Sequence, residues 1–591
     1  MMAPMPTLPE RFVQSVAQRA GQVAMRWKRL GLWQDISWDT WGRQASSLGL
    51  ALLSSGLSRG DRVAVLAATR PESLYVEFGA LGTGILPVSL FPGQSRAELV
   101  RALQQSAARM LFVGDQEQLF LALPLLEEVP ALERIVYMDG RGLHAFSHPR
   151  VSSFEAFQDT GQRLLAIEPD RWMAEVTQAK AQDPALWIST SGTSGPARGM
   201  LITHHALLVQ LDRLAQTVVG MEGDWQLSLL PMGLALERCL TLYRCVMQGS
   251  VIHLGEGMPA ARENLREVSA QLVVAVPWLW TRLHATVQQA VDRATATGRW
   301  GYRLTLGVGE RMDALRQAGK APSLPLRMLD ALLGRTVRRR ILALIGLQRA
   351  RCLVSTGAPI PDELVRWYRA MGLDFLDVYG SAESSGFAAL LGAGHGANGQ
   401  ILRLGAQGEI LLLGDHLAQS PDGVRADGMP TGDVGEFQSE GGLRVIGRLV
   451  ERITLANGLS LMPGDLEASI RRSPYIADAV LVGHGREALS CLVLIDHERV
   501  ADFAQKREIP FSNFTSLTRL AEVRKLVQDH IDSINSSLHP DLRISATGLM
   551  TEELMSGDEM LSPVLSLRRE VVIRRYAVLI DSLYAGSDST D

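Results

Sequence analysis

Two spacings of apolar residues alternate along the first third of the chain. Residues 38–57 place apolar side chains three and four positions apart, which is typical of one face of a helix. A Gly60-Asp61 turn separates this segment from the apolar run 62–66, which predicts a short buried strand. The alternation continues with predicted helices at 73–84 and 96–107 and predicted strands at 85–91, 110–113 and 183–188. Strands that alternate with helices predict a largely parallel α/β fold.

The pattern changes twice in the rest of the chain. A strand at 272–275, a mostly helical stretch at 281–347 and strands at 352–355 and 373–377 extend the α/β region. Residues 392–427 are rich in glycine and predict short strands joined by turns. From about residue 445, helices and strands alternate on a smaller scale, and a last predicted helix at 567–583 precedes a polar tail. We therefore expect a smaller α+β domain at the C-terminal end.

Composition and charge exclude several classes of protein. Hydrophobic residues make up 46% and charged residues 21% of the 591 positions, an ordinary globular mixture. The net charge of −4 excludes a chain built around bulk attraction to nucleic acid. The four cysteines are far apart and form no CxxC pair, so we expect neither a disulfide framework nor a zinc site, and a reducing compartment is the default: Cys239, Cys245, Cys352 and Cys491.

Two features bear on the location of the protein. The N-terminal segment has no basic stretch followed by an apolar core, and no apolar run reaches the roughly 18 residues of a spanning helix. We therefore expect a cytoplasmic protein. A basic cluster surrounds the apolar stretch 341–347 and has two interpretations, a solvated helix face or peripheral attachment to anionic lipid at the inner face of a membrane. Its members are Arg335, Arg338, Arg339, Arg340, Arg349 and Arg351.

A loop of small polar residues carries the first chemical signal. It follows a predicted strand, precedes the helix-like segment 201–217, and reads Thr190, Ser191, Gly192, Thr193, Ser194, Gly195, ending in Arg198 and Gly199. Backbone N–H groups of such a loop can converge on phosphate oxygens, and glycine permits a close approach. A flexible linker is the alternative, but a buried strand in front and an apolar helix behind argue against it. The loop is not a Walker motif, because GxxxxGK[ST] is missing.

This loop resembles the phosphate loop of adenylate-forming (AMP-binding) enzymes, which include acyl-CoA synthetases, luciferases and the adenylation domains of peptide synthetases. Further motifs of that superfamily follow in order, namely Pro231 to Glu237-Arg238, Ser355-Thr356-Gly357-Ala358-Pro359, Tyr379-Gly380-Ser381-Ala382-Glu383, Thr431-Gly432-Asp433, Gly447-Arg448 to Gly458, and Pro463-x-x-Leu466-Glu467. The long helical insert before Ser355 and the tail 561–576 resemble the long-chain fatty acyl-CoA synthetases.

The resemblance implies a two-domain fold and a two-step reaction. It implies a large N-terminal AMP- and acyl-binding domain of mixed sheets with flanking helices, 1–446, and a small mobile C-terminal domain, 447–591. A carboxylate attacks the α-phosphate of ATP, which gives acyl-AMP and pyrophosphate, and coenzyme A then displaces AMP. The implied cofactors are ATP, Mg²⁺ and coenzyme A. The implied partners are a fatty acid and either coenzyme A or an acyl carrier protein.

The resemblance also implies roles for single residues. Glu383 is expected to hold Mg²⁺ against the phosphates. Tyr379 is expected to stack on adenine, Asp433 to accept hydrogen bonds from the ribose diol, and Arg448 to add a charged donor. The adenine side of the site is expected to include Gly357, Ala358, Pro359 and Gly380. The phosphate loop, from Thr190 to Gly195, completes the nucleotide site.

The sequence departs from the superfamily pattern at several positions. Ser566 stands where these enzymes carry a lysine that bridges the acyl carboxylate and the α-phosphate, and Arg198 replaces the loop lysine. Loss of one preorganised electrostatic group costs on the order of 10²–10³ in rate. Leu234, Ala382 and Val450 replace residues that are usually polar in these enzymes. We take Glu383, Arg198 and Ser566 as the candidate catalytic positions.

Three functions remain open from the sequence. The first is an ATP-dependent fatty acid–CoA ligase of the long-chain type. The second is an adenylation-impaired homologue that binds nucleotide or an acyl ligand and has a regulatory role. The third is a ligase that transfers the acyl group to an acyl carrier protein. Retention of Glu383, Asp433 and Arg448 favours nucleotide use, whereas Ser566 favours the second function.

Overall fold

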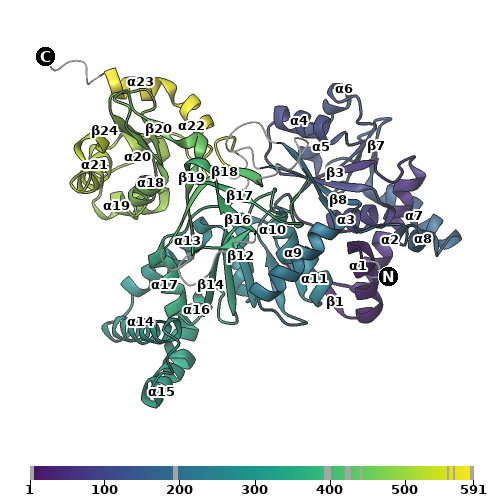
Figure 1. The fold of residues 1–591 in the computed structure, drawn as a ribbon, viewed down its shortest axis with the longest axis horizontal. Coiled ribbons are helices and arrows are strands. Elements are labelled where there is room, and N and C mark those ends of the chain that lie inside the picture. Colours follow the sequence, from purple (N-terminus) through teal and green to yellow (C-terminus); the bar gives the residue numbers. More distant parts are fainter. Residues whose placement is uncertain are drawn as a thin grey trace.

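The computed structural model describes residues 6–190, 198–391, 401–419, 428–438, 442–554, 558–562 and 566–585. Two α/β sheets and one antiparallel sheet form a large N-terminal part, and a three-stranded sheet with helices forms a smaller C-terminal part (Figure 1). The predicted fold class is confirmed. No helix within the described ranges is long and apolar enough to cross a bilayer.

The first sheet has seven strands in the order β7-β6-β5-β3-β4-β8-β9, parallel throughout except for the antiparallel β8–β9 pair. Its strands are β3 (Arg62–Leu66), β4 (Leu86–Leu90), β5 (Met110–Val113), β6 (Arg134–Tyr137), β7 (Val151–Ser153), β8 (Pro184–Ser189) and β9 (Gly199–Thr203). The helices of this region are α1 (Leu8–Arg19), α2 (Trp38–Ser54), α3 (Pro71–Thr83), α4 (Arg96–Ser106), α5 (Gln116–Ala122), α6 (Leu125–Glu128), α7 (Phe154–Ile167) and α8 (Arg171–Val176). Every residue of β4 and β5 is buried, as expected of a parallel sheet covered on both faces.

The second sheet has eight strands in the order β15-β14-β13-β12-β10-β11-β1-β2. They are β1 (Val23–Arg29), β2 (Leu32–Ser37), β10 (Trp225–Ser228), β11 (Val251–Leu254), β12 (Leu272–Ala275), β13 (Cys352–Thr356), β14 (Asp374–Tyr379) and β15 (Ala389–Leu390). Its helices are α9 (His204–Thr217), α10 (Ala235–Glu237), α11 (Arg244–Gln248), α12 (Ala261–Val268), α13 (Pro277–Asp292), α14 (Ala296–Gln317), α15 (Leu324–Leu333), α16 (Arg339–Leu344) and α17 (Asp362–Ala370). Two π-helical segments, η1 (Arg238–Tyr243) and η3 (Gly334–Arg338), join α10 to α11 and α15 to α16, and η2 (Met258–Ala260) is a short 3₁₀ turn.

An antiparallel sheet links the large part to the C-terminal part. Its strands are β16 (Leu402–Leu404), β17 (Glu409–Leu412), β18 (Met429–Phe437) and β19 (Leu443–Arg448), with 3₁₀ turns η4 (Ala406–Gly408) and η5 (Leu449–Glu451). The C-terminal part contains β20 (Ile453–Thr454), β21 (Ser460–Leu461), β22 (Ile476–Val482), β23 (Leu489–Ile495) and β24 (Ile544–Leu549). Its helices are α18 (Gly464–Ile470), α19 (His497–Lys506), α20 (Phe514–Arg519), α21 (Ala521–Asn535), α22 (Arg569–Arg575) and α23 (Ala577–Ala585), with η6 (Pro540–Leu542).

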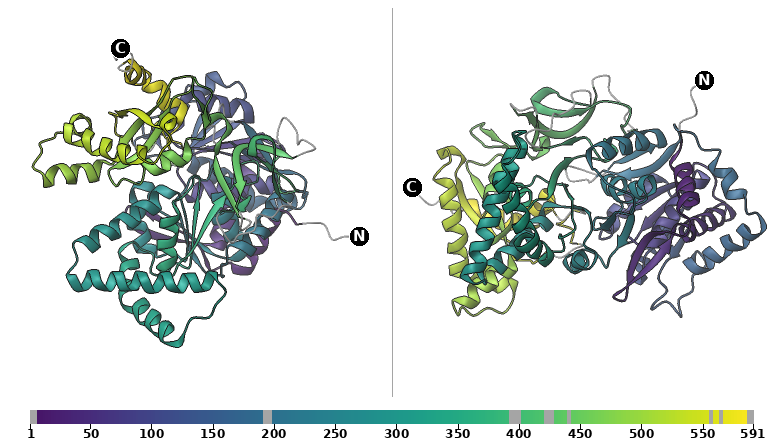
Figure 2. Two further views of the ribbon diagram at one scale, coloured as in Figure 1. Left: turned by 60° about the vertical axis from the view of Figure 1, so that its left-hand side comes forward. Right: turned by 90° about the horizontal axis from the view of Figure 1, so that it is seen from below.

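Separate apolar cores support the two parts. The main core joins the first helices to both α/β sheets, and it includes Phe12 and Phe78, whose rings stack, with the Trp41 ring edge-on to both. The C-terminal part has a core of its own around Val493 and Phe514. A unit with its own core can move as a body against its neighbour. Figure 2 shows it standing against one end of the large part.

Several predicted elements are confirmed, and two are wrong. The apolar runs 62–66, 110–113 and 272–275 coincide with β3, β5 and β12. The segment 201–217 is not helical throughout, because Leu201 and Ile202 pair with β8 in strand β9 before α9 begins. An apolar run of this length does not by itself distinguish strand from helix.

The second wrong prediction concerns the tail. The helix expected at 567–583 is two helices, α22 and α23, interrupted at Tyr576. The buried ring of Tyr576 packs with Val572 and Ile580 in a second apolar cluster of the C-terminal part. Its hydroxyl accepts a hydrogen bond from the Glu552 N–H at 3.3 Å. Tertiary packing thus overrides the helical spacing of the apolar residues.

Candidate active site

Tyr379, Asp433 and Arg448 meet where two sheets approach each other. Tyr379 ends β14, while Asp433 in β18 and Arg448 at the end of β19 are direct partners in the antiparallel register. The Tyr379 hydroxyl donates to Asp433 Oδ2 at 2.7 Å, and Arg448 Nε lies 3.2 Å from Asp433 Oδ1. The structure therefore brings together three of the residues that the motifs selected separately.

Burial sets the electrostatics of this cluster. Burial raises the pKa of Asp433 above its ordinary value, and the positive charge of Arg448 and the Tyr379 hydrogen bond oppose the rise. Burial and the negative charge of Asp433 hold the pKa of Tyr379 well above its usual range. The tyrosine thus stays a proton donor to Asp433. A carboxylate has about four acceptor positions, so Asp433 can still accept hydrogen bonds from a vicinal diol.

Glu383 lies in the turn that follows β14. Its negative charge raises the pKa of both Asp433 and Tyr379, which places its carboxyl group near that pair. The side chain is half-buried, and the backbone carbonyl is fixed by a hydrogen bond from the Ala418 N–H at 2.9 Å. No group of three or more histidine, cysteine or acidic side chains that could hold a metal ion occurs in the described residues. A metal at Glu383 therefore needs oxygens from a substrate or water, as is usual for Mg²⁺.

The segment Gly357-Ala358-Pro359 emerges beside Tyr379. Strands β13 and β14 are parallel neighbours, and Thr356 pairs with Val378, so Gly357 and Tyr379 follow at the same edge of the sheet. Gly357 has a φ of +90°, which favours glycine. A Cβ at Gly380 would lie 1.9 Å from the carbonyl oxygen of Gly386, so only glycine fits there. The backbone of these residues therefore lies next to Tyr379.

Two hydrogen bonds between Thr190 and Arg198 join the ends of the phosphate loop. Thr190 N–H donates to the Arg198 carbonyl at 2.9 Å, and Arg198 N–H donates to Thr190 Oγ1 at 2.9 Å. The loop joins the antiparallel strands β8 and β9, so it does not open a helix, in contrast to the prediction. The candidate residues between these ends lie outside the described residues: Ser191, Gly192, Thr193, Ser194 and Gly195.

Ser566 lies in the C-terminal tail and bonds within that tail. Its hydroxyl lies 2.7 Å from the Ser562 hydroxyl, and its N–H donates to Ser562 Oγ at 3.2 Å. Two residues later, Arg568 Nη1 reaches Glu98 Oε1 on α4 at 2.5 Å. Among the described residues, Ser566 has no hydrogen bond to the Tyr379 cluster. The structure does not bring the expected catalytic position and that cluster into direct contact.

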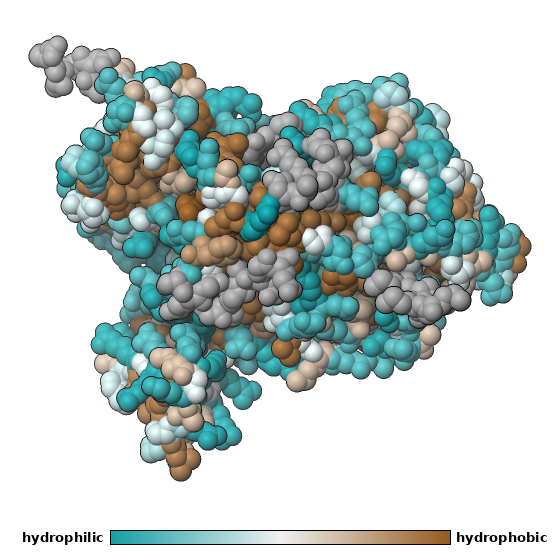
Figure 3. All heavy atoms as spheres, in the orientation of Figure 1, coloured by the Kyte–Doolittle hydropathy of each residue, from teal (hydrophilic) through white to brown (hydrophobic). Residues whose placement is uncertain are grey.

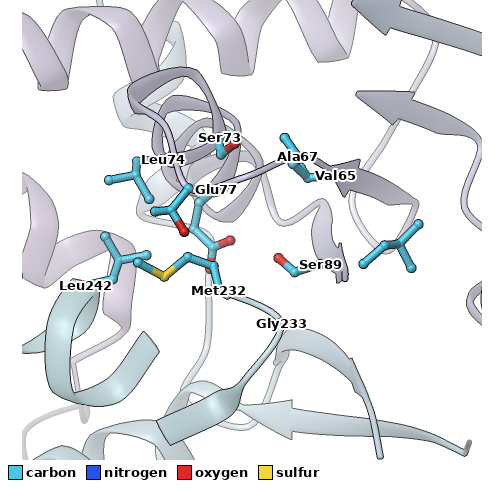
Figure 4. Close-up of a pocket in the computed structure, with 11 residues that line it drawn as sticks. Val65, Ala67, Ser73, Leu74, Glu77, Ser89, Met232, Gly233 and Leu242 are labelled. Carbon is cyan, nitrogen blue, oxygen red and sulfur yellow. The ribbon is translucent and has the colours of Figure 1, made fainter. Parts of the chain in front are cut away.

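A buried polar network between α3 and η1 was not predicted from the sequence. Arg238, at 1% exposure, donates from Nη2 to Glu77 Oε2 at 3.0 Å and also bonds Ser89, while the Tyr243 hydroxyl donates to Glu77. Glu77 and Ser89 line a cavity of about 20 Å³, which has room for one water molecule (Figure 4). Glu77 belongs to α3, far from Arg238 in sequence, and the only signal was an acidic residue inside an apolar helix.

The residue before Arg238 is buried as well. Glu237 is fully buried, and burial raises the pKa of its carboxyl group to about 8, although a hydrogen bond from Ser228 at 2.9 Å opposes the rise. The Glu237 carboxyl group is therefore mostly protonated at neutral pH. The carboxyl group of Glu237 is thus neutral, whereas the neighbouring Arg238 is charged and forms a buried ion pair with Glu77.

Comparisons with protein families cover nearly the whole chain. The model of the AMP-binding enzyme matches residues 12–427, and the model of the AMP-binding enzyme C-terminal domain matches residues 451–588. A long-chain-fatty-acid–CoA ligase, FadD15, from Mycobacterium bovis is 26% identical over 94% of this chain and 93% of its own length. The long-chain-fatty-acid–CoA ligase heimdall from Drosophila melanogaster is 24% identical over 98% of this chain and 95% of its own length.

Solved structures share the fold at low sequence identity. The adenylation domain of a carboxylate reductase from Mycobacterium chelonae superposes with a TM-score of 0.72 at 17% identity, covering 99% of this chain and 92% of that one. The anthranilate CoA ligase AuaEII, solved with anthranoyl-AMP, gives a TM-score of 0.71 at 16% identity, covering 98% of this chain and 99% of that one. At these identities the likeness concerns the fold alone.

Proposed function

Because this chain belongs to the AMP-binding enzyme family, we propose that it activates a long-chain fatty acid as its acyl adenylate and transfers the acyl group to coenzyme A. Membership of this family makes the protein an adenylate-forming enzyme that activates a carboxylic acid. The fatty acid and the coenzyme A acceptor are supported by relatives of nearly equal length that carry this activity in their names.

The single observation that carries the proposal is the contact of Tyr379, Asp433 and Arg448. In the proposed complex, Asp433 accepts hydrogen bonds from the ribose hydroxyls, and Arg448 holds the Asp433 carboxylate in place. The Tyr379 ring faces adenine. Gly357, Ala358, Pro359 and Gly380 provide backbone close to the base. The phosphates are expected at the loop between Thr190 and Arg198, because its glycines permit a close approach of backbone N–H groups and Arg198 carries a positive charge.

Both chemical steps can be written with balanced bonds. In the first, a fatty acid carboxylate oxygen attacks the α-phosphorus, the bond from that phosphorus to the bridging oxygen breaks, and pyrophosphate leaves. In the second, the coenzyme A thiolate attacks the acyl carbon and AMP leaves with the bonding electrons. Glu383 suits one Mg²⁺ ligand position, because it is a half-buried carboxyl group near the nucleotide cluster. Bound Mg²⁺ neutralises phosphate charge.

A second function keeps the nucleotide site but not the first chemical step. The observation that favours it is Ser566, whose hydroxyl bonds Ser562 and carries no charge for the developing phosphate oxygens. In that case the protein binds ATP or an acyl ligand in a regulatory role. Under the first function, Arg198 is the proposed source of the missing positive charge.

The experiment that separates these functions is pyrophosphate release by the full chain with ATP and Mg²⁺. Fatty acids of short, medium and long chain are offered, each without acceptor, with coenzyme A and with an acyl carrier protein. Release that depends on a long-chain acid, together with an acyl-CoA product, supports the proposal. If a thioester forms only on the acyl carrier protein, the acceptor is that protein and not coenzyme A. Nucleotide binding without pyrophosphate release for any acid supports the second function, and Glu383→Gln serves as the low-activity reference.

A further inference from the structure

Helix α15 presents a row of large apolar side chains to solvent. Leu324, Met328 and Leu332 are 68%, 66% and 60% exposed. They are four residues apart, so they lie along one face of the helix. Leu333, by contrast, is 7% exposed and packs inward. The helix is therefore anchored by one face and leaves an apolar row uncovered on another.

This row lies at the tip of a projection. Helices α14 and α15 extend from the large part, and Figures 1 and 2 place α15 away from β18, β19 and the C-terminal part. Figure 3 shows hydrophobic side chains at this tip among hydrophilic ones. Trp300 on α14 is 66% exposed and adds a large aromatic side chain to the projection. Tryptophan is typical of the boundary between lipid and water.

Basic residues flank the apolar row. Residues 320–340 contain six basic side chains and one acidic side chain, a local net charge of +5 in a chain whose net charge is −4. The acid, Asp330, is paired with Arg338. Arg327 lies three residues after Leu324, and Arg335 lies three residues after Leu332, so both border the row. In the described part of the chain, Arg327, Arg335 and Arg339 are exposed and form no ion pair.

We propose that α15 docks the protein on the surface of a bilayer that contains anionic lipid. Leu324, Met328 and Leu332 would enter the boundary between headgroups and acyl chains, while the flanking arginines contact anionic headgroups. An acidic protein would also match the charge, and the test below includes that outcome. A carrier protein must also reach the nucleotide site, which lies far from this tip. The inference does not depend on the proposed function.

The test uses the full chain and lipid vesicles. Vesicles of phosphatidylcholine alone and with about one third phosphatidylglycerol are mixed with the protein, and bound protein is measured by flotation. We expect binding to the anionic vesicles, weak binding to the neutral ones, and loss of binding at high salt, because surface charge is screened. Absence of binding to anionic vesicles at low salt overturns the proposal.

Two variants test which residues carry the binding. Arg327→Gln, Arg335→Gln and Arg339→Gln together should weaken binding about 100-fold, since each basic residue near an anionic surface is worth about fivefold. Leu324→Ser, Met328→Ser and Leu332→Ser together should weaken it at least about tenfold. The matched controls change equally exposed residues on other elements: Arg163→Gln, Arg472→Gln and Arg574→Gln, and Ile167→Ser, Val219→Ser and Val578→Ser.

The outcomes are distinct. Equal loss in test and control variants overturns the assignment to α15, because it shows a general effect of charge or hydrophobicity. Tight binding to an acidic carrier protein without binding to vesicles assigns the surface to a protein partner and overturns the lipid proposal. Melting temperatures of all variants should match that of the wild type, since the changed side chains are exposed.

Discussion

Arg568 in the C-terminal tail and Glu98 on α4 form an ion pair between the two parts of the chain, with Nη1 and Oε1 2.5 Å apart. Glu98 also accepts from the N–H of Ser95 at 2.9 Å. Burial opposes ionisation of Glu98, but the Ser95 hydrogen bond and Arg568 outweigh it and lower its pKa. The pair therefore persists at neutral pH and favours the orientation of the C-terminal part seen here.

Breaking this pair should loosen the junction between the two parts. The Arg568 and Glu98 side chains are 15% and 31% exposed. Because a solvent-accessible ion pair contributes about 0.2–1 kcal/mol, Glu98→Gln should speed limited proteolysis near Leu449–Glu451 up to about fivefold. Val450 in this segment is 64% exposed and accessible to a protease. The boundary between 446 and 447 remains a prediction that the fragments test.

The matched control is Asp39→Asn, which breaks an ion pair with Arg43 inside α2 and should leave the cleavage rate unchanged. Cleavage only within the large part, with no C-terminal fragment released, contradicts the predicted boundary. An equal rate in wild type and Glu98→Gln contradicts the role of the ion pair.

Removal of the Asp433 carboxylate should weaken nucleotide binding. Asp433→Ala should cost ~1–3 kcal/mol in the binding of ATP with Mg²⁺ measured by calorimetry, the scale of hydrogen bonds to a charged group. Tyr379→Phe keeps the ring and the carboxylate and should cost less, because only the hydrogen bond at 2.7 Å is lost. Unchanged affinity in Asp433→Ala, with a folded protein, refutes the assignment of Asp433.

A cation at position 566 should restore the first half-reaction if its absence limits the rate. Ser566→Lys should raise acyl-AMP formation ~10-fold or more, since one charge-assisted contact is worth roughly 1.5–3 kcal/mol. Thioester formation from preformed acyl-AMP should change little. Ser537→Lys adds the same charge at an exposed serine of the C-terminal part and should have no effect.

Two results contradict this reasoning about Ser566. A wild type that already adenylates rapidly and does not respond to the lysine has another cation in place, with Arg198 the first to test. If wild type and variant are both inactive with every acid, the second, non-catalytic function gains support.

The buried Glu237 should make stability depend on pH. Its folded-state pKa of about 8 lies above the ordinary value, so the folded state holds a proton that the unfolded state releases between these values. Stability therefore falls as pH rises through this interval, by about 3 kcal/mol from pH 5.5 to 8. Glu237→Gln keeps the shape and removes the titration.

The measurement is the melting temperature of both proteins at these two pH values. The melting temperature of the variant relative to that of the wild type should be higher at pH 8 than at pH 5.5. A difference between the two proteins that is the same at both pH values contradicts the burial of a titrating carboxyl group. Glu117→Gln, an exposed position on α5, is the control.

The sequence predicted best those elements whose local pattern is complete. Strands β3, β5 and β12 are apolar runs bounded by turn residues, and their bounds were predicted to the residue. The pairing of β1 with β11 could not be predicted, because it joins segments more than two hundred residues apart. No local spacing in either segment specifies the other as its partner.

The same division applies to the candidate site. Tyr379, Asp433 and Arg448 each lie in a short motif and could be selected one by one, although their contact depends on the register of β18 with β19. The partnership of Glu77 with Arg238 had no comparable motif. It depends on how α3 packs against η1, which is a property of the assembled core.

The contact of Arg238 and Tyr243 with Glu77 depends on the number of residues in the π-helical turn η1 as well as on the side chains themselves. Arg238 and Tyr243 are five residues apart and both reach Glu77. Residues five apart lie about 140° apart around an α-helix but only about 50° apart in a π-turn. A one-residue deletion in this segment would convert it to an ordinary turn and separate the two donors. Insertions and deletions here should therefore be far less tolerated than substitutions.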